Sequence, residues 1–536
     1  LSIRRQRQMC IRDSYSFNEH FIIQWRIFPH SPCCIKKSVY GFYTNMKYRL
    51  LPVIHELARL NIIFACIFWL PGLISMYEGD RLEAVWLIFF AIIALFSTLI
   101  YQMTKHCQRA LQGRDGFLFA SLFWILFSLE AAWPMHFSHI STSFTNAYFE
   151  AVSGLTTTGS SIYPNPDLLE PSINFWRHLL NWLGGMGIIV LAVAIIPTLG
   201  IGGMNIIKAE MSGVNKGQKL TPRIRQTAAY LWGTYIVITL IVALALWGAG
   251  MSLFDAICHA FSSISLGGFS THGDSIGYFH SFTIELILEI SMLMGCVNFV
   301  NHVQVIRYLN PRLYLHDVEI RSSFKILFLS ILISSIYLWY KGYYGTDAMG
   351  LLTSFRNVLF NYVSVATTCG YSTVDFAKWP IYAGFAIYIL ANFIPNSGST
   401  GGGVKMIRAV IQFKVLGREI VTLLHPKAVK PVKVNGNVLP TTTALTVMSF
   451  ILVYFVVLIT VTLLMIFTGQ DPVSAYSFTV ATLTNSGPGI GQLGPMADLN
   501  VGLTTFQKWL ELITMLLGRL EIFTLLVLFL PDYWKN

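Results

Sequence analysis

The stretch Asn146–Ser160, NAYFEAVSGLTTTGS, occurs in four related copies in this chain of 536 residues. The other copies are Asp255–Phe269 (DAICHAFSSISLGGF), Asn357–Tyr371 (NVLFNYVSVATTCGY) and Ser474–Pro488 (SAYSFTVATLTNSGP). Each copy is an apolar segment too short to cross a bilayer, and it ends in a polar run that contains glycine. This pattern predicts four re-entrant pore loops.

Three alignment columns relate the copies. The glycine column holds Gly159, Gly268, Gly370 and Gly487. A second column holds Ala147, Ala256 and Ala475, with Val358 in the third copy, and a third column holds Ser153, Ser262 and Ser364, with Ala481 in the fourth. One glycine-containing run would indicate no more than a helix end and a turn. Four in register, each between two apolar spans, indicate a repeated structural unit.

The composition is that of a polytopic membrane protein. Hydrophobic residues make up 54% of the chain and charged residues 12%, and long apolar runs follow one another closely. The net charge of +11 comes from basic residues in short loops between these runs, which is typical of cytoplasmic loops and not of a nucleic-acid surface. The eight cysteines show no CxxC pair and no Cys/His metal spacing, so the sequence supports neither a disulfide framework nor a zinc site.

We therefore predict an all-α membrane protein with four pseudo-symmetric span–pore-loop–span repeats around a central pore, preceded by a two-helix hairpin. The predicted parts are a leader (1–45), the hairpin (46–112) and the repeats (113–222, 223–318, 319–436 and 437–536). The predicted spans are 53–77 and 84–103, joined by Glu78-Gly79-Asp80, then 116–135 and 173–199, 227–250 and 281–306, 324–340 and 380–413, and 441–468 and 505–530. Each is near the roughly 20 residues that a bilayer requires.

The leader is expected to lie outside the fold. It lacks an apolar signal region and a small-residue cleavage site, and Met46-Lys47 resembles a natural start. A non-native extension and a disordered cytoplasmic tail both remain open.

The basic loops predict the orientation. They carry Lys105, Arg109 and Arg114; Lys208, Lys216, Lys219, Arg223 and Arg225; Arg307, Arg312, Arg321 and Lys325; and Lys414, Arg418, Lys427, Lys430 and Lys433. When the spans are counted, all these loops fall on one side, which the positive-inside rule makes cytoplasmic. The pore loops then open outward, and both termini are cytoplasmic.

A cation selectivity filter explains the loops chemically. Non-helical backbone at membrane depth survives only where protein buries it or it lines water, and a ring of carbonyls there can replace the hydration shell of a cation. Glycine allows the positive φ that such a strand needs, and the preceding short helix points its negative end at the ion. In the fourth copy that helix is predicted to start at Asp471-Pro472. The candidate filter residues are Thr157, Thr158, Gly159 and Ser160; Leu266, Gly267, Gly268 and Phe269; Thr368, Cys369, Gly370 and Tyr371; and Asn485, Ser486, Gly487 and Pro488.

The segment Gly398–Lys405 (GSTGGGVK) lies inside an apolar span. A phosphate-binding loop requires Gly-Lys followed by Ser or Thr, but Val404 separates glycine from Lys405 here. Consecutive glycines disfavour helix by about 1 kcal/mol each, so we predict a broken helix. A tight helix crossing is the alternative.

Arg519 is a charge within the last span, and a charge at that depth is by default functional. We expect loop carbonyls of Gly401–Gly403 to hold it, because Glu521, two positions on, cannot share its helical face. A structural pair with Glu521 remains the alternative.

The repeats resemble those of the Trk/Ktr/HKT superfamily of potassium transporters. Further blocks that resemble the family are Arg114–Phe117 (RDGF), Trp182–Gly187 (WLGGMG), Gly398–Lys405 and Met515–Phe523 (MLLGRLEIF). The N-terminal hairpin makes the chain more similar to the TrkH branch than to KtrB. Two features depart from the family: Cys369, where a small apolar residue is usual, and Ile394–Ser397 (IPNS), in place of a small-residue run.

The resemblance covers residues 46–536 and implies potassium uptake across a bacterial inner membrane by a multi-pass protein. It implies K⁺ as the transported ion with no covalently bound cofactor, a homodimer in membrane lipid, and a cytosolic nucleotide-binding regulatory subunit of the TrkA kind. It also implies that Ser399, Thr400, Gly401, Gly402 and Gly403 form a gate loop below the filter, with Arg519 lining the pore beside it.

Two other functional classes fit the sequence less well. An ion-coupled symporter of a different substrate is the alternative function, but broken-helix symporters usually show inverted two-fold repeats. A membrane enzyme would need an acid/base or metal constellation, and the sequence contains neither HExxH nor GxSxG. Channel-like conduction and coupling to sodium or protons are both compatible with the filter residues.

Overall fold

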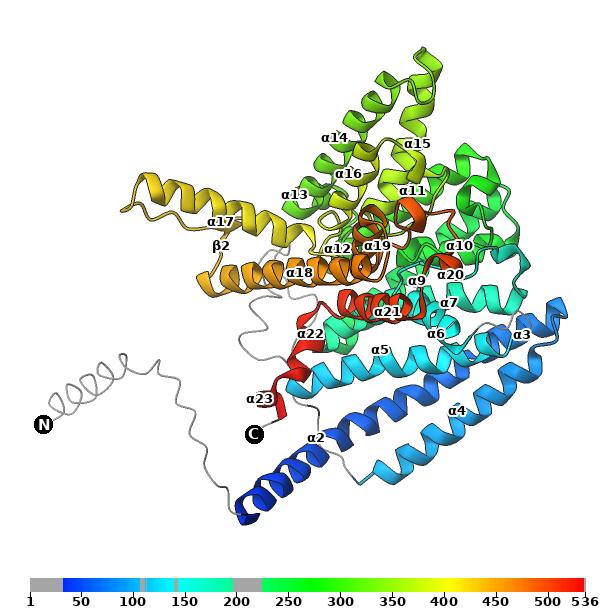
Figure 1. Cartoon of the computed structure of the whole chain (residues 1–536), viewed down its shortest axis with the longest axis vertical. Helices are drawn as coiled ribbons and strands as arrows, with labels where there is room; N and C mark the ends of the chain where they lie inside the picture. The colour runs from blue at the N-terminus through cyan, green and yellow to red at the C-terminus, as the bar shows by residue number, and fades with distance from the viewer. Residues whose placement is uncertain (1–31, 107–110, 112, 139–142, 196–223, 535–536) are drawn as a thin grey trace, which may run out of the picture.

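The computed structural model describes residues 32–106, 111, 113–138, 143–195 and 224–534 (Figure 1). The described elements are helices apart from one antiparallel hairpin, β1 (Lys433–Val434) and β2 (Asn437–Val438). The predicted all-α class is confirmed.

The N-terminal helices form the predicted hairpin. Its elements are α2 (Pro32–Ile67), α3 (Trp69–Glu78) and α4 (Glu83–Thr104). Gly79 ends α3 in a left-handed conformation (φ +73°), and its N–H donates to the Ser75 carbonyl, so the turn lies at the predicted Glu78-Gly79-Asp80. The boundary predicted at residue 45 falls inside α2, and residues 1–31 of the predicted leader lie outside the described residues.

The rest of the chain repeats one order of elements four times: a long helix, a short helix, an irregular loop and a third helix. The four sets are α5 (Gly113–His136), α6 (Phe144–Leu155) and α7 (Pro171–Ile195); α9 (Ile224–Gly248), α10 (Leu253–Ser265) and α11 (Phe282–Cys296); α14 (Val318–Tyr340), α15 (Ala348–Ala366) and α16 (Ile381–Ala391); and α18 (Thr441–Phe467), α19 (Pro472–Thr484) and α21 (Thr505–Arg519). Between and after them lie α12 (Phe299–Tyr308), α13 (Arg312–His316), α17 (Met406–Leu424), α20 (Leu499–Gly502), α22 (Phe523–Leu526) and α23 (Pro531–Trp534), with short 3-10 turns at Pro166–Leu168, Ser275–Phe279, Phe376–Lys378, Gly491–Leu493 and Val527–Phe529.

The four sets close into a ring. Each short helix packs against the long helix and the third helix of its own set, and also against the third helix of the set before it: α10 contacts α7, α15 contacts α11, and α19 contacts α16. The contact between α6 and α21 joins the first set to the fourth. The short helices therefore surround one common centre.

Large aromatic side chains attach the hairpin to the first set. The ring of Trp176 on α7 lies 4.7 Å from that of Phe68 and 5.5 Å from that of Trp86, centroid to centroid. The indole N–H of Trp86 donates to the Ser172 hydroxyl at 3.1 Å. Because a buried tryptophan needs a partner for its N–H, this bond also fixes the register of the hairpin on α7.

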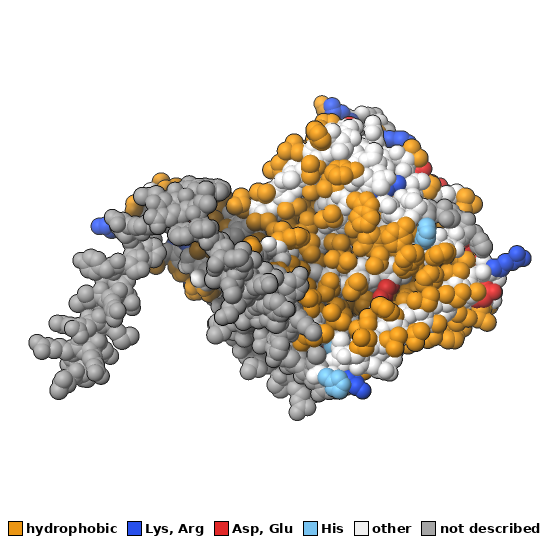
Figure 2. All heavy atoms as spheres, turned by 60° about the horizontal axis from the view of Figure 1, so that its bottom comes forward, with side chains coloured by type: hydrophobic (Ala, Val, Ile, Leu, Met, Phe, Trp, Pro, Cys, Tyr) orange, Lys and Arg blue, Asp and Glu red, His pale blue; other side chains and the backbone are white. Residues whose placement is uncertain are grey.

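The outer surface is apolar over a wide area. Exposed aliphatic and aromatic side chains recur along α4, α9, α14 and α18, and Figure 2 shows one such face, on which charged side chains are sparse. Among the described residues, six helices are long and apolar enough to cross a membrane, or eight if two sharply bent pairs each count as one span. α7 and the broken α16–α17 segment occupy the positions of the other two predicted spans. An apolar surface of this extent faces lipid.

Three of the predicted spans are broken, and only one of these breaks, within 380–413, is predicted from the sequence. The span 281–306 bends by 102° between α11 and α12, the span 380–413 is irregular between α16 and α17, and the span 505–530 bends by 105° after α21. At the first break, Val297 is extended and the Asn298 side chain caps α12 by accepting the Val300 N–H at 2.9 Å. The prediction of continuous helices at 281–306 and 505–530 is therefore wrong.

Candidate functional site

The short helices begin with side-chain caps. Ser143, Ser252, Asp347 and Asp471 each accept a backbone N–H of the first helical turn. Asp471 is followed by Pro472 at the first helical position, as the sequence predicts. These caps satisfy donors that would otherwise be unpaired at a helix start inside the protein.

The short helices also end alike. In each copy, the residue before the column glycine donates its N–H to the carbonyl six residues before that glycine: Thr158 to Ser153, Gly267 to Ser262, Cys369 to Ser364 and Ser486 to Ala481, at 2.7–2.8 Å. The residue two before the glycine is left-handed in every copy: Thr157 (φ +55°), Leu266 (+57°), Thr368 (+69°) and Asn485 (+56°). This is the Schellman helix ending, and its acceptors form the Ser153 column of the alignment.

The column glycines are left-handed too, and each faces the next loop around the ring. Added β-carbons on Gly159, Gly268 and Gly370 would overlap the carbonyl oxygens of Gly267, Cys369 and Ser486 respectively. A β-carbon on Gly487 would lie 2.8 Å from the carbonyl oxygen of Thr158, which closes the ring. Their φ angles lie between +70° and +96°, so steric access and backbone conformation both require glycine.

The structure therefore brings all four predicted filter runs together: Thr157–Ser160, Leu266–Phe269, Thr368–Tyr371 and Asn485–Pro488. Side chains tie neighbouring runs to each other. The Asn485 amide donates to the Thr158 hydroxyl at 2.9 Å, and the Ser160 hydroxyl donates to the Gly487 carbonyl at 2.7 Å. The Tyr371 hydroxyl donates to the His259 carbonyl on α10, at 3.3 Å.

In the first three copies, a polar side chain on the short helix binds the segment that follows the column glycine, and we call this side chain a brace. The sequence analysis does not predict the braces. Glu150, nine residues before Gly159, accepts the Ile162 N–H at 2.9 Å and pairs with Arg177 of α7 at 2.7 Å. Both side chains of the pair are buried, and the Arg177 guanidinium lies 4.3 Å from the centre of the Phe269 ring. The signal was available: a carboxylate in a short apolar segment requires a buried cation, and Arg177 is in the following span.

In the second and third copies, the brace is a histidine and an asparagine instead of a glutamate. His259 occupies the position of Glu150 and its Nε2 lies 3.0 Å from the Ser270 hydroxyl. Asn361 occupies it in the third copy, where its amide donates to the Thr373 hydroxyl at 3.0 Å. Each brace holds the segment that follows the column glycine against its own short helix.

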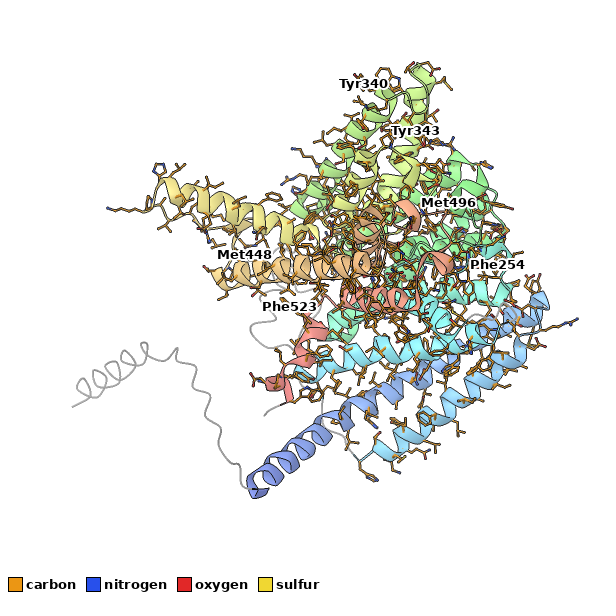
Figure 3. The ribbon with its side chains drawn as sticks, viewed as in Figure 1. Phe254, Tyr340, Tyr343, Met448, Met496 and Phe523 are labelled. Atoms are coloured by element: carbon orange, nitrogen blue, oxygen red, sulfur yellow. The ribbon has the colours of Figure 1, made fainter. Side chains whose placement is uncertain are left out.

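A cavity of about 390 Å³ opens on the side of the ring toward which the loops run after their glycines. Gly159, Gly268 and Gly370 line its floor, and polar residues of the following segments line its walls. Figure 3 labels Met496, a lining residue from the segment after the fourth loop. The cavity gives water access to the ring from this side.

His272 links the first two sets in the wall of this cavity. Its Nδ1 lies 2.5 Å from Asp167 and its Nε2 lies 3.6 Å from Asp255. Burial alone would lower the pKa of His272, but its interactions with Asp255 and Asp167 outweigh burial and raise the pKa. For Asp167, burial raises the pKa, but the His272 contact and the Gly273 N–H outweigh it and lower the pKa. Both shifts therefore favour the charged forms of the two side chains.

The predicted gate residues lie on the opposite side of the ring. Residues 392–405 are outside any helix, so the predicted break is confirmed and a continuous helix crossing is not present. The Thr400 hydroxyl donates to the Ile264 carbonyl at 3.1 Å, and the Gly402 N–H donates to the Thr368 hydroxyl at 3.2 Å. A β-carbon on Gly402 would overlap the Thr484 carbonyl. Ser399–Gly403 thus lies against the ends of three short helices.

Arg519 connects this loop to the first set. Its guanidinium donates to the Thr400 carbonyl and to the Gly184 carbonyl of α7, each at 2.8 Å, and the residue is buried. The acceptor in the loop is Thr400, so the prediction of Gly401–Gly403 is wrong by one residue. Glu521 contacts Lys405 and Arg408 instead, because the chain turns away from the α21 axis directly after Arg519.

Fold and site together define a helical membrane protein in which four short helices and the loops that follow them meet around one centre. The chain belongs to the TrkH family, described as cation transport proteins, which matches residues 83–536. The Trk system potassium uptake protein TrkH of Escherichia coli (strain K12) is 41% identical over 479 residues, covering 89% of this chain and 98% of that protein. The protein of the same name from Halomonas elongata is 41% identical over 488 residues, covering 90% and 99%.

A solved structure agrees with this assignment. The crystal structure of the potassium transporter TrkH from Vibrio parahaemolyticus matches with a TM-score of 0.82 at 36% identity, covering 91% of this chain and 100% of that chain. The resemblance predicted from the repeats is therefore confirmed, and the chain is a transport protein and not an enzyme.

Proposed function

We propose that this protein takes up potassium ions across a bacterial inner membrane through a selectivity filter formed by the four loops. The observation that carries the proposal is the ring in which each column glycine faces a carbonyl of the next loop. Backbone carbonyls held at this density can replace the hydration shell of a cation. The relatives named above are potassium uptake proteins, which favours K⁺ as the transported ion, with no covalent cofactor in the process.

The glycine-rich loop is proposed as the gate. Ser399–Gly403 lies against three of the short helices on one side of the ring, and Arg519 joins it to the first set through the Gly184 carbonyl. A cation that leaves the filter on this side meets a backbone segment and a buried positive charge. Because the loop is not part of a helix, it can move without breaking a hydrogen-bond ladder.

The multi-pass protein is proposed to lie with the His272 cavity outside the cell and both termini in the cytoplasm. This orientation rests on the basic residues of the loops opposite that cavity, such as Arg312, Lys414 and Lys430. A homodimer in membrane lipid and a cytosolic nucleotide-binding subunit of the TrkA kind are proposed as partners. Their assembly can be tested by native mass spectrometry of the purified protein, alone and mixed with such a subunit.

Uptake of ⁸⁶Rb⁺ into proteoliposomes tests the function. We expect uptake that excess external K⁺ abolishes and that Na⁺ and Li⁺ reduce far less. Vesicles that contain the Gly268→Ala variant, in which an added β-carbon would overlap the Cys369 carbonyl, provide the matched control. Equal competition by the three ions would contradict a K⁺ filter, and uptake of an organic solute driven by Na⁺ would favour the symporter alternative.

A further inference from the structure

Two irregular segments meet beneath the ring, and each contains left-handed residues that are not glycine. Lys405, at the end of the gate loop, has φ +72°. Glu521 and Ile522, between α21 and α22, have φ +53° and +51°. Each such residue is strained, because its β-carbon crowds the backbone in the left-handed conformation. Conformations of this kind persist only where surrounding contacts hold them in place.

Glu521 supplies contacts to both segments. One carboxylate oxygen lies 3.4 Å from the Lys405 Nζ, and the other accepts a hydrogen bond from Arg408 at 2.6 Å. Lys405 and Arg408 are 5% and 4% exposed. The carboxylate therefore pairs with two buried cations that flank the start of α17 and offsets one of their two positive charges. Buried charges of this kind are costly unless they are paired.

Aromatic side chains extend the same cluster to α18. The Arg408 guanidinium lies 3.9 Å from the centre of the Phe450 ring, and Phe450 packs edge-on against Phe523 at 5.7 Å. Figure 3 shows Phe523 at the turn into α22, beside α18. Glu521 in the break thus contacts the cations that follow the gate loop directly, and Phe523 after the break joins the same cluster through Phe450.

The loop has two kinds of attachment. Glu319 of α14 accepts the Ser397 N–H at 2.7 Å and the Ile407 N–H at 3.2 Å, so it closes the two ends of the segment onto each other. Arg519 and Glu521 instead hold the loop at Thr400 and Lys405. Arg519 is the last residue of α21, and Glu521 lies in the bend that follows it. The bend cannot straighten without releasing both contacts.

We propose that Glu521 is a positioning residue that locks the gate loop to the bend after α21 through Lys405 and Arg408. The inference rests on the proposed gating role of Ser399–Gly403 and names the contact that keeps the loop in place. Losing the carboxylate leaves two buried cations without this partner, which pushes the start of α17 toward water and loosens the loop.

The experiment compares purified full-length Glu521→Gln with wild type, without a regulatory subunit. Hydrogen–deuterium exchange of peptides covering 399–408 should rise at least about tenfold, since hydrogen bonds to charged groups are the stronger kind. Peptides from α10 should be unchanged, which separates local release from general destabilisation. ⁸⁶Rb⁺ flux should rise with the exchange. Glu521→Asp keeps the charge and should restore most of the slow exchange.

Glu419→Gln is the matched control, because Glu419 lies on α17 and pairs with Arg418 at an exposed position. It should change neither exchange nor flux. Lys405→Gln removes only the 3.4 Å contact with Glu521 and should give a smaller rise in exchange at 399–408. If Glu521→Gln does not fold, the Lys405→Gln variant tests the lock. Unchanged exchange at 399–408 in a folded variant overturns the lock. Faster exchange with unchanged flux keeps the lock and overturns the gating role of the loop.

Discussion

At the scale of single residues, two left-handed positions in each loop shape the ring, and only one of them is visible in the sequence. The glycine column is plain because glycine is the residue that adopts positive φ freely. The position two residues earlier is Thr157, Leu266, Thr368 or Asn485, and of these types only asparagine is enriched in that conformation. At Thr157, Leu266 and Thr368 the Schellman hydrogen bond imposes the left-handed backbone. The residue types at these positions therefore do not predict this conformation.

Replacing a column glycine tests the ring directly. Gly268→Ala should reduce ⁸⁶Rb⁺ uptake at least about tenfold or reduce K⁺ over Na⁺ selectivity, because alanine resists positive φ and its β-carbon has no room. Competition-uptake assays measure both. Gly233→Ala is the control: it lies in α9 with open space around it and should leave transport unchanged. Wild-type selectivity in Gly159→Ala, Gly268→Ala, Gly370→Ala and Gly487→Ala would remove the basis of the filter.

We expect Arg519 to contribute an electrostatic barrier at the proposed gate. A guanidinium about 6 Å from a K⁺ ion repels it by roughly 3 kcal/mol at an effective dielectric constant near 20. Arg519→Ala should therefore raise cation flux, by up to about a hundredfold, with K⁺ over Na⁺ preference largely kept. Initial rates of ⁸⁶Rb⁺ uptake measure this effect, and Arg418→Ala on α17 serves as a charge-matched control. A folded Arg519→Ala variant with wild-type flux would place this arginine outside the ion path.

At the scale of elements, the third helix of each set was the hardest to predict. Apolar character runs on through the breaks after α11 and α21, and the sequence there lacks the glycine triplet that reveals the break before α17. Asn298 caps α12 and Glu521 pairs with cations distant in sequence. The break after α21 therefore involves tertiary contacts, whereas the break after α11 has a local cap that lies within a continuous apolar run. Three short helices begin two residues before the predicted copies, at Phe144, Leu253 and Pro472, whereas α15 begins at Ala348, nine residues before the third copy.

Shortening the gate loop tests its role as an element. Deleting Gly401 and Gly402 should raise ⁸⁶Rb⁺ flux in the absence of a regulatory subunit, because the loop would no longer reach the ends of the short helices at Thr368 and Thr484. A monodisperse elution profile must accompany the flux measurement. Lower or unchanged flux in such protein would assign the loop a purely structural role.

At the scale of the whole molecule, contacts between sets decide the assembly. The alignment of four copies was enough to predict a ring of repeats, because equivalent units tend to pack equivalently. It could not predict the particular contacts between sets, such as Arg177 with the Phe269 ring or His272 with Asp167. These involve residue types that change between copies, so each junction is stabilised by its own chemistry.

The His272 contact should make stability depend on pH. The pKa of His272 is raised in the folded protein, so its contribution is complete below the unfolded-state value and is lost as pH rises through the folded-state pKa, while Asp167 stays ionised. His272→Ala should lower the melting temperature more at about pH 6 than at about pH 9. Thermal unfolding in detergent measures this difference. The control is His280→Asn, at an exposed left-handed position. It should change the melting temperature equally at both pH values or leave it unchanged at both.

The ring of glycines and carbonyls has a direction. A carbonyl of each loop lies against the column glycine of the loop before it in the chain. A carbonyl of the first loop lies against the column glycine of the fourth loop. A substitution at one glycine therefore displaces the next loop and leaves the opposite loop untouched. Energetic effects of paired substitutions should follow this handedness: Gly159→Ala with Gly370→Ala should combine additively, whereas Gly159→Ala with Gly268→Ala should not, since residues in contact rarely act independently. A single chain that carries four unequal quarters can thus change one quarter while only one neighbour has to adapt.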